Sequence, residues 1–168
     1  MKYIQACGLE EHEVYFFEVD GQMAAYRQVS VVNGHCRVSV APDFHLIETE
    51  VELFEGDEEI TREAFEEIWQ QAVLPYREAW EKAKSLCPPG KNVAGTIRMF
   101  YPQGVIIQLD EGAYAVADDP GLREKTPPAW MYPGYRIQGK VERADEALLM
   151  LVLKDCRVTG KKVEEMHL

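Results

Sequence analysis

The chain has 168 residues, which is long enough for one large domain or two small ones. Its apolar fraction of 46% and charged fraction of 28% are those of an ordinary folded protein and exclude an intrinsically disordered one. No apolar run approaches the length of a membrane span, and the first residues lack the apolar core of a secretion signal, so we expect a cytoplasmic protein.

The net charge of −11 is carried entirely by the first half of the chain. Residues 1–87 contain 7 Lys or Arg and 18 Asp or Glu, whereas residues 88–168 contain 11 of each. Proteins that bind nucleic acid tightly and without sequence preference usually carry a basic excess, which this chain lacks. Most of the carboxylates are therefore interpreted as a solvated surface that keeps the protein soluble.

The cysteines and histidines do not predict a metal site. The four cysteines are widely separated, include no C-x-x-C pair, and are expected to stay reduced in the cytosol. Cys36 follows His35, and His12 and His45 lie in the same half, but their spacing matches no zinc-ligand pattern. We expect no metal and no cofactor.

The first half begins with short strands separated by turns. An edge strand is predicted at residues 3–6, and three further strands at residues 13–20, 23–32 and 35–41. Asp20-Gly21 and Asn33-Gly34 are the hairpin turns between them, because these residue types tolerate positive φ.

Residues 47–54 are predicted to form one more strand. Apolar and acidic residues alternate there, which would turn one set inward: Ile47, Thr49, Val51 and Leu53. Residues 55–59 are interpreted as an acidic turn, because a calcium loop needs a longer set of spaced oxygens than they supply.

A kinked helix is predicted over residues 61–86. Thr61 is a suitable N-cap, and Pro75 removes a backbone donor, so a break is expected near Leu74. Its apolar face has helical spacing and is expected to pack on the sheet rather than bind a ligand: Phe65, Ile68, Trp69, Ala72, Tyr76, Trp80 and Ala83.

Three segments of this half resemble small stand-alone bacterial proteins of unknown function: residues 18–29, 42–44 and 59–69. The resemblance implies a module of one sheet and one helix, and it implies no activity.

The second half begins after a linker and is predicted to consist mainly of strands. Pro88-Pro89-Gly90 ends the helix. Two strands are predicted within residues 95–109 with a bend at Pro102, and three more at residues 113–117, 135–141 and 148–154. Residues 119–133, which contain four prolines, are expected to form an exposed loop. Trp130, Met131 and Tyr132 would either cap the barrel or form a contact patch.

The order and spacing of these pieces are similar to the S1-like oligonucleotide/oligosaccharide-binding (OB) barrel. The matching segments are Gly95-Thr96-Ile97, residues 104–109, residues 134–137 and residues 151–154. The resemblance covers residues 93–158 and implies a five-stranded barrel. In this family a short helical turn often occupies the place of the loop at residues 119–133.

The sequence departs from the RNA-binding members of that family at the positions that stack on bases. Gln103 and Ile106 stand where those members usually have aromatics, and Thr96 stands where a basic residue often follows the first glycine. Residues 115–118 replace the region in which a histidine is common. Since stacking contributes about 1–3 kcal/mol per base, the usual site is not carried over residue by residue.

The predicted organisation has four parts. Residues 1–87 form an acidic α+β module, an antiparallel meander plus a kinked helix. Residues 88–92 form the linker, residues 93–158 an all-β S1-like barrel, and residues 159–168 a tail that frays.

No catalytic motif is present in the sequence. None of the three serines lies in a G-x-S-x-G elbow, and the chain contains neither a phosphate-binding loop nor G-x-G-x-x-G. Carboxylate pairs are numerous, but a catalytic pair requires a cleft and a shifted pKa. We expect a binding protein rather than an enzyme.

Two kinds of partner are compatible with the sequence. The resemblance favours single-stranded RNA, and the candidate residues are Arg98, Phe100, Tyr101, Tyr114, Arg136 and Lys140. Strand alternation predicts that Thr96, Arg98 and Phe100 share one face. The missing stacking positions and the acidic first half favour the alternative, a protein-interaction or regulatory module that meets a basic protein. The oligomeric state is left open.

Overall fold

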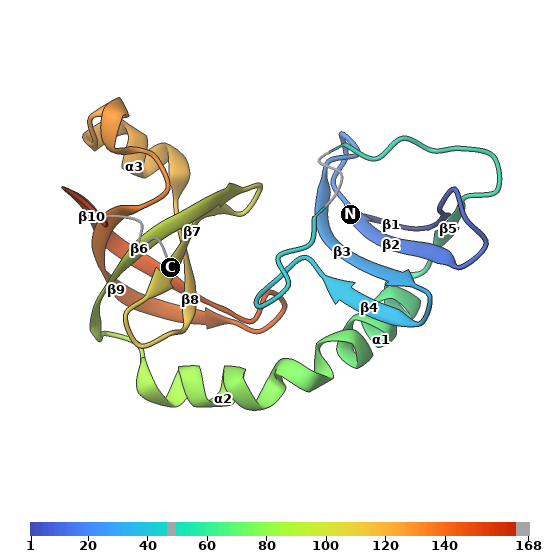
Figure 1. Cartoon of the computed structure of the whole chain (residues 1–168), viewed down its shortest axis with the longest axis horizontal. Coiled ribbons are helices and arrows are strands. Elements are labelled where there is room, and N and C mark those ends of the chain that lie inside the picture. The colour runs from blue at the N-terminus through green and yellow to red at the C-terminus, as the bar shows by residue number, and fades with distance from the viewer. Residues whose placement is uncertain (47–49, 164–168) are drawn as a thin grey trace. The chain divides into compact units, whose positions relative to one another are not determined.

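The structure, a computed structural model, describes residues 1–46 and 50–163 (Figure 1). The chain divides into two compact units, Met1–Arg77 and Glu78–Leu168. Each unit contains five strands, so the protein belongs to the β-rich α+β class. The division precedes most of helix α2 (Arg77–Leu86), ten residues before the expected linker at 88–92. That linker stays a prediction.

The first unit is built on an antiparallel sheet with the strand order β4-β3-β2-β1-β5. Its strands are β1 (Lys2–Cys7), β2 (Glu13–Val19), β3 (Ala25–Val32), β4 (His35–Val38) and β5 (Glu58–Ile60). The expected Asn33-Gly34 turn joins β3 to β4, and both residues have positive φ. The prediction of an edge strand at residues 3–6 is wrong in one respect, because β1 lies between β2 and β5.

The strand expected at residues 47–54 is not formed over residues 50–54. Glu50 makes only an isolated bridge to Ala24, and residues 47–49, including Ile47 and Thr49, lie outside the described residues. Val51 is buried as expected, but Leu53 is 57% exposed. A strand forms further along the chain instead: β5, which overlaps the predicted acidic turn of residues 55–59, pairs with β1. Alternation predicted the burial of Val51 but could not predict which segment supplies the edge strand.

The helix of the first unit begins and breaks where the sequence predicts. In α1 (Arg62–Val73) the Thr61 hydroxyl accepts a hydrogen bond of 3.1 Å from the amide of Ala64. The 3₁₀ turn η1 (Leu74–Tyr76) holds Pro75 and separates α1 from α2. Among the described residues, no helix is both long and apolar enough to cross a membrane.

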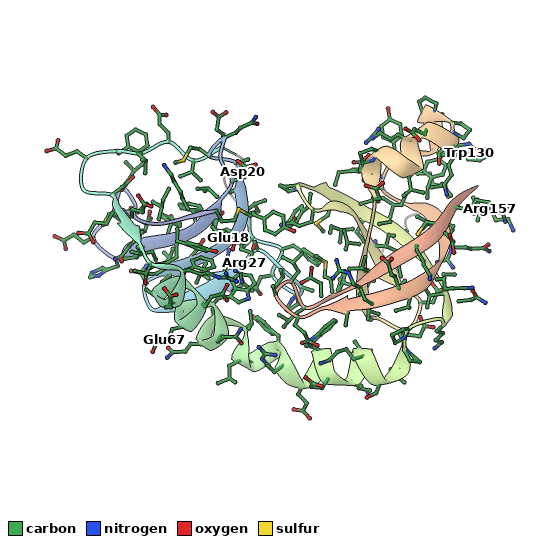
Figure 2. All side chains as sticks on the ribbon, turned by 180° about the vertical axis from the view of Figure 1, so that it is seen from behind. Glu18, Asp20, Arg27, Glu67, Trp130 and Arg157 are labelled. Atoms are coloured by element: carbon green, nitrogen blue, oxygen red, sulfur yellow. The ribbon has the colours of Figure 1, made fainter. Side chains whose placement is uncertain are left out.

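A buried arginine lies between the sheet and α1 (Figure 2). Arg27 on β3 is 3% exposed and donates two hydrogen bonds of 2.8 Å to the carboxylate of Glu18 on β2. It also contacts the carboxylate of Glu66 on α1. Its guanidinium lies 5.0 Å from the ring centroids of both Phe65 and Trp69. One side chain thus links two strands to the helix.

The carboxylates keep Arg27 charged in spite of its burial. Burial alone would lower the pKa of Arg27, but hydrogen bonds to Glu18 and Glu66 raise it above its usual range. Burial and a hydrogen bond to Glu18 raise the pKa of the neighbouring Tyr3. Because Glu18 is only 5% exposed, its charge is compensated mainly by Arg27.

Removing Arg27 should therefore destabilise the first unit strongly. Arg27→Met leaves Glu18 buried without its cation, which is expected to cost about 3–5 kcal/mol of unfolding free energy. Urea unfolding followed by tryptophan fluorescence measures this change. The control Arg37→Met removes an exposed arginine of β4 and should stay within about 0.5 kcal/mol of the original protein. Equal effects of the two changes would contradict this account of Arg27.

The second unit contains a closed barrel with the strand order β10-β8-β7-β6-β9. Its strands are β6 (Asn92–Tyr101), β7 (Gly104–Leu109), β8 (Tyr114–Ala117), β9 (Tyr135–Asp145) and β10 (Met150–Lys162). The pair of β8 and β10 is parallel, and the other pairs are antiparallel. The fraying tail predicted from residue 159 is wrong over residues 159–162, which belong to β10.

The segment expected as an exposed loop contains regular structure. It holds α3 (Asp119–Lys125), capped by the carboxylate of Asp118, and the 3₁₀ turn η2 (Pro128–Trp130). Met131 is buried, whereas Tyr132 is 59% exposed. The ring of Trp130 lies against Gly160 of β10, so the three residues do not act as one patch.

The barrel interior is filled by side chains that face one another across the strands. They are Val93, Ile97, Val105, Ile107, Leu109, Ala115, Ile137, Leu151 and Val158, all buried. Gly95 lies among them on β6. A Cβ at this position would stand 2.5 Å from the carbonyl oxygen of Gln108 and 2.8 Å from Cγ2 of Ile107. Glycine is therefore required there by close packing.

Gly95→Ala should destabilise the barrel, because the added methyl group meets backbone that cannot move aside. We expect a loss of about 1–3 kcal/mol in urea unfolding. Gly21→Ala is the matched control, since a Cβ at Gly21 meets nothing within 4 Å. A Gly95→Ala protein as stable as the control would show that the strands can separate without cost.

Candidate functional site

Four side chains form a row across the outer surface of the barrel. Thr96 on β6 pairs with Gln108 on β7 and with Arg136 on β9, and Gln108 pairs with Tyr114 on β8. Directly opposed residues of a pleated sheet project to the same face. We call Tyr114, Gln108, Thr96 and Arg136 the outer row. Three interstrand spacings make it about 14 Å wide.

Hydrogen bonds connect the members of the outer row. Arg98 donates from Nε to Oε1 of Gln108 at 2.8 Å, which places its exposed guanidinium beside the row. Arg136 donates from Nη1 to Oγ1 of Thr96 at 3.2 Å. The outer row and Arg98 together therefore place two cations, an amide, a hydroxyl and one aromatic ring at one surface.

Arg136 is also engaged by a carboxylate at the end of β7. Its two terminal nitrogens donate to the two oxygens of Asp110, each at 2.7 Å. These hydrogen bonds lower the pKa of Asp110 and raise that of Arg136. Both side chains are partly exposed, so the pair contributes at most about 1 kcal/mol of stability. A phosphate group would have to compete with Asp110 for Arg136.

Phe100 does not lie on the face that alternation predicts. The pairing of β6 with β7 shifts register between Ile97 and Met99, so that Met99 opposes Ile106 and Phe100 opposes Val105. This bulge at Arg98 inverts the alternation, and Phe100 joins the interior face of Ile97. The predicted grouping of Thr96, Arg98 and Phe100 is therefore wrong for Phe100.

The ring of Phe100 is also covered, because the guanidinium of Arg123 on α3 lies 5.4 Å from its centroid. It is thus occupied within the fold rather than open to a ligand. Tyr101 is half-buried, and burial raises its pKa to about 12. Of the three predicted aromatics, Tyr114 is the one in the outer row.

Ile106, one of the positions that depart from the RNA-binding pattern, offers no stacking surface. This side chain is fully buried, so it cannot receive a base. Ala115, Val116 and Ala117 are buried too, and Asp118 serves as the N-cap of α3. Any base stacking on this surface therefore depends on Tyr114.

Lys140 lies apart from the other candidates. It pairs with Asn92 on β6 and Lys154 on β10, four residues along β9 from Arg136. There it lines an open groove of the barrel surface. The structure thus brings Arg98, Tyr114 and Arg136 together and separates Phe100, Tyr101 and Lys140 from them.

Sequence reasoning placed Thr96 on the face of Arg98, but it did not identify Gln108 and Asp110 as part of this surface. Gln108 interrupts the apolar run of β7, and a polar side chain in such a run is a signal for a face that meets solvent or a ligand. Asp110 directly follows β7 and carries no such signal. Its pairing with Arg136 requires two strands that are far apart in sequence.

The polar groups of this surface are not arranged as a metal site. Among residues 1–46 and 50–163, no three His, Cys, Asp or Glu side chains are grouped so that they could hold a metal ion. No protein-family model matches the sequence, and no curated protein matches it significantly.

The pairing of Arg136 with Asp110 can be measured directly. A carboxyl group whose pKa is lowered by folding stabilises the native state above its unfolded pKa, and this contribution is lost as pH falls through the folded pKa. Arg136→Gln should therefore raise the pKa of Asp110 toward its ordinary value, as followed by the NMR shift of its carboxyl carbon. Lys82→Gln, on the exposed side of α2, should leave that pKa unchanged. An unaltered pKa in Arg136→Gln would mean that the ion pair does not form in solution.

Proposed function

We propose that the barrel unit binds single-stranded nucleic acid through the outer row and Arg98, and that the protein is a binding protein without catalytic activity. The observation that carries the proposal is the gathering of an aromatic ring, an amide, a hydroxyl and two guanidinium groups on one surface. Aromatic rings receive bases by stacking, and guanidinium groups contact phosphates.

The topology of the barrel supports the proposal. Its strands β6 to β10 close in the order β6-β7-β8-β10-β9, and the single helix between β8 and β9 is α3. The OB architecture is likewise a small five-stranded barrel, and it binds oligonucleotides on the face of its second and third strands. The outer row crosses β7 and β8, the corresponding strands of this chain.

The alternative is a protein-interaction module with a basic protein as partner. The first unit favours it, because residues 1–77 contain 16 Asp or Glu and only 5 Lys or Arg. Such a surface attracts a basic partner and repels phosphates. The two functions differ in the surface that they use, so they are distinguishable by substitution.

The first test is binding of a labelled oligouridylate to the full chain, measured by fluorescence anisotropy. Tyr114→Leu removes the ring and should weaken binding about 5- to 150-fold, the equivalent of about 1–3 kcal/mol for one stacked base. Tyr114→Phe keeps the ring and should bind as the original protein does.

Tyr132→Leu is the matched control, because Tyr132 is an exposed tyrosine outside the row. A loss of affinity confined to Tyr114→Leu supports the proposal. If the full chain does not bind the oligonucleotide, or if the two leucine variants behave alike, the outer row is not a nucleic-acid site. Binding of a polylysine peptide by the same chain would then favour the protein-interaction alternative.

A further inference from the structure

The barrel surface carries an open groove beside the outer row. It lies where the start of β6 meets the middle of β9 and the bulged part of β10, and its volume is about 690 Å³. Its polar lining comes from Asn92 on β6, Gln138 and Lys140 on β9, and Asp155 and Arg157 on β10. We call these five residues the polar groove.

Two local features shape this groove. The pairing of β9 with β10 shifts register between Lys154 and Arg157, and Asp155 has a positive φ of 52°. Gly139 lines the groove with its backbone, and a Cβ there would stand 2.7 Å from the Sγ of the buried Cys156, on the interior side of β9. The bulge of β10 thus shapes the surface at this point.

The cations of the groove are available to a ligand. Among the residues that the structure describes, neither Lys140 nor Arg157 makes a side-chain hydrogen bond or ion pair, in contrast to Arg136. Figure 2 shows the side chain of Arg157 pointing away from the barrel. The groove contains one carboxylate, that of Asp155.

The strands around the groove have a basic excess that the unit as a whole lacks. Together β9 and β10 carry seven Lys or Arg and three Asp or Glu. The complete unit of residues 78–168 contains 13 of each. Positive charge is therefore concentrated on these two strands, where it attracts phosphates.

The composition of the groove indicates which part of a nucleic acid it would contact. Its lining contains no aromatic residue, so bases have nothing to stack on. Lysine and arginine pair with phosphate oxygens, and the amides of Asn92 and Gln138 can donate to phosphate and accept from ribose hydroxyl groups. This chemistry suits a sugar-phosphate backbone better than an acidic peptide, which offers no hydroxyl groups at the same spacing as its charges.

The groove continues the face of the outer row. Along the ladder of β6 and β9, the outward pairs are Thr96 with Arg136, Ala94 with Gln138, and Asn92 with Lys140. The first and last pairs are four residues apart, or about 13 Å along the strand. A single extended strand could therefore contact both surfaces.

We propose that the polar groove binds the phosphodiester backbone of the strand whose bases contact the outer row. This inference rests on the proposed function, which it extends by assigning base contacts and phosphate contacts to different surfaces. Stacking at Tyr114 then supplies the salt-independent part of the affinity, and Lys140 with Arg157 supplies the salt-dependent part.

The test is the salt dependence of binding to a labelled ten-nucleotide oligouridylate by the full chain. The double variant Lys140→Gln/Arg157→Gln removes two phosphate contacts, each worth about 0.7 in the slope of log affinity against log salt. Between 50 and 200 mM salt it should lose about sevenfold less affinity than the original protein. Asp155→Asn removes the carboxylate of the groove and should bind more tightly than the original protein. Asparagine tolerates the positive φ of this position.

Lys82→Gln/Lys125→Gln is the matched control, because it removes the same charge from exposed positions of α2 and α3. A reduced slope in the groove variant and an unchanged slope in this control support the inference. If the original protein binds, Tyr114→Leu weakens binding, and the groove variant shows the same salt slope as the control, the inference fails while the proposed function stands. If the original protein does not bind at all, the proposed function fails and the inference with it.

A peptide ligand gives a different result. If the groove variant binds the oligonucleotide normally but loses affinity for a labelled polyglutamate peptide, the groove is a site for acidic protein and the inference is overturned. Circular dichroism of each variant verifies that the fold is retained.

Discussion

The surface of the barrel depends on one extra residue in β6. The bulge between Ile97 and Met99 leaves Arg98 outside, beside Gln108, and turns Phe100 to the interior face. Without it, strict alternation would place Phe100 beside Thr96 on the surface. The bulge thus places the ring of Phe100 within the fold, near Arg123, and leaves the guanidinium of Arg98 beside the outer row.

The two units balance their buried and exposed charges differently. In the first unit Arg27 is held by Glu18 and Glu66 and covered by aromatic rings, so its charge serves the packing of α1 on the sheet. In the second unit the arginines and lysines of the outer row and the polar groove are partly or fully exposed. The acidic first unit accordingly contributes no cation to the proposed interface, and the basic excess of β9 and β10 stands out against a neutral unit.

Local signals in the sequence predicted most of the elements and little of the site. Thr61 and Pro75 determine where α1 begins and ends through a cap and a missing donor, and Asn33-Gly34 fixes a turn through positive φ. The edge strand β5, the bulge at Arg98 and the pair of Arg136 with Asp110 depend on contacts between segments distant in sequence. Alternation alone could predict neither which acidic segment pairs with β1 nor where a strand gains a residue.

The most direct test of nucleic-acid binding by the barrel is NMR mapping of the full chain as unlabelled oligouridylate is added. The account predicts that the backbone amides of Thr96, Gln108 and Arg136 shift together with those of Gln138 and Lys140, and that the amides of β1 to β5 do not. Shifts confined to the first unit, or no shifts at millimolar oligonucleotide, would contradict the assignment of this surface to a nucleic-acid strand.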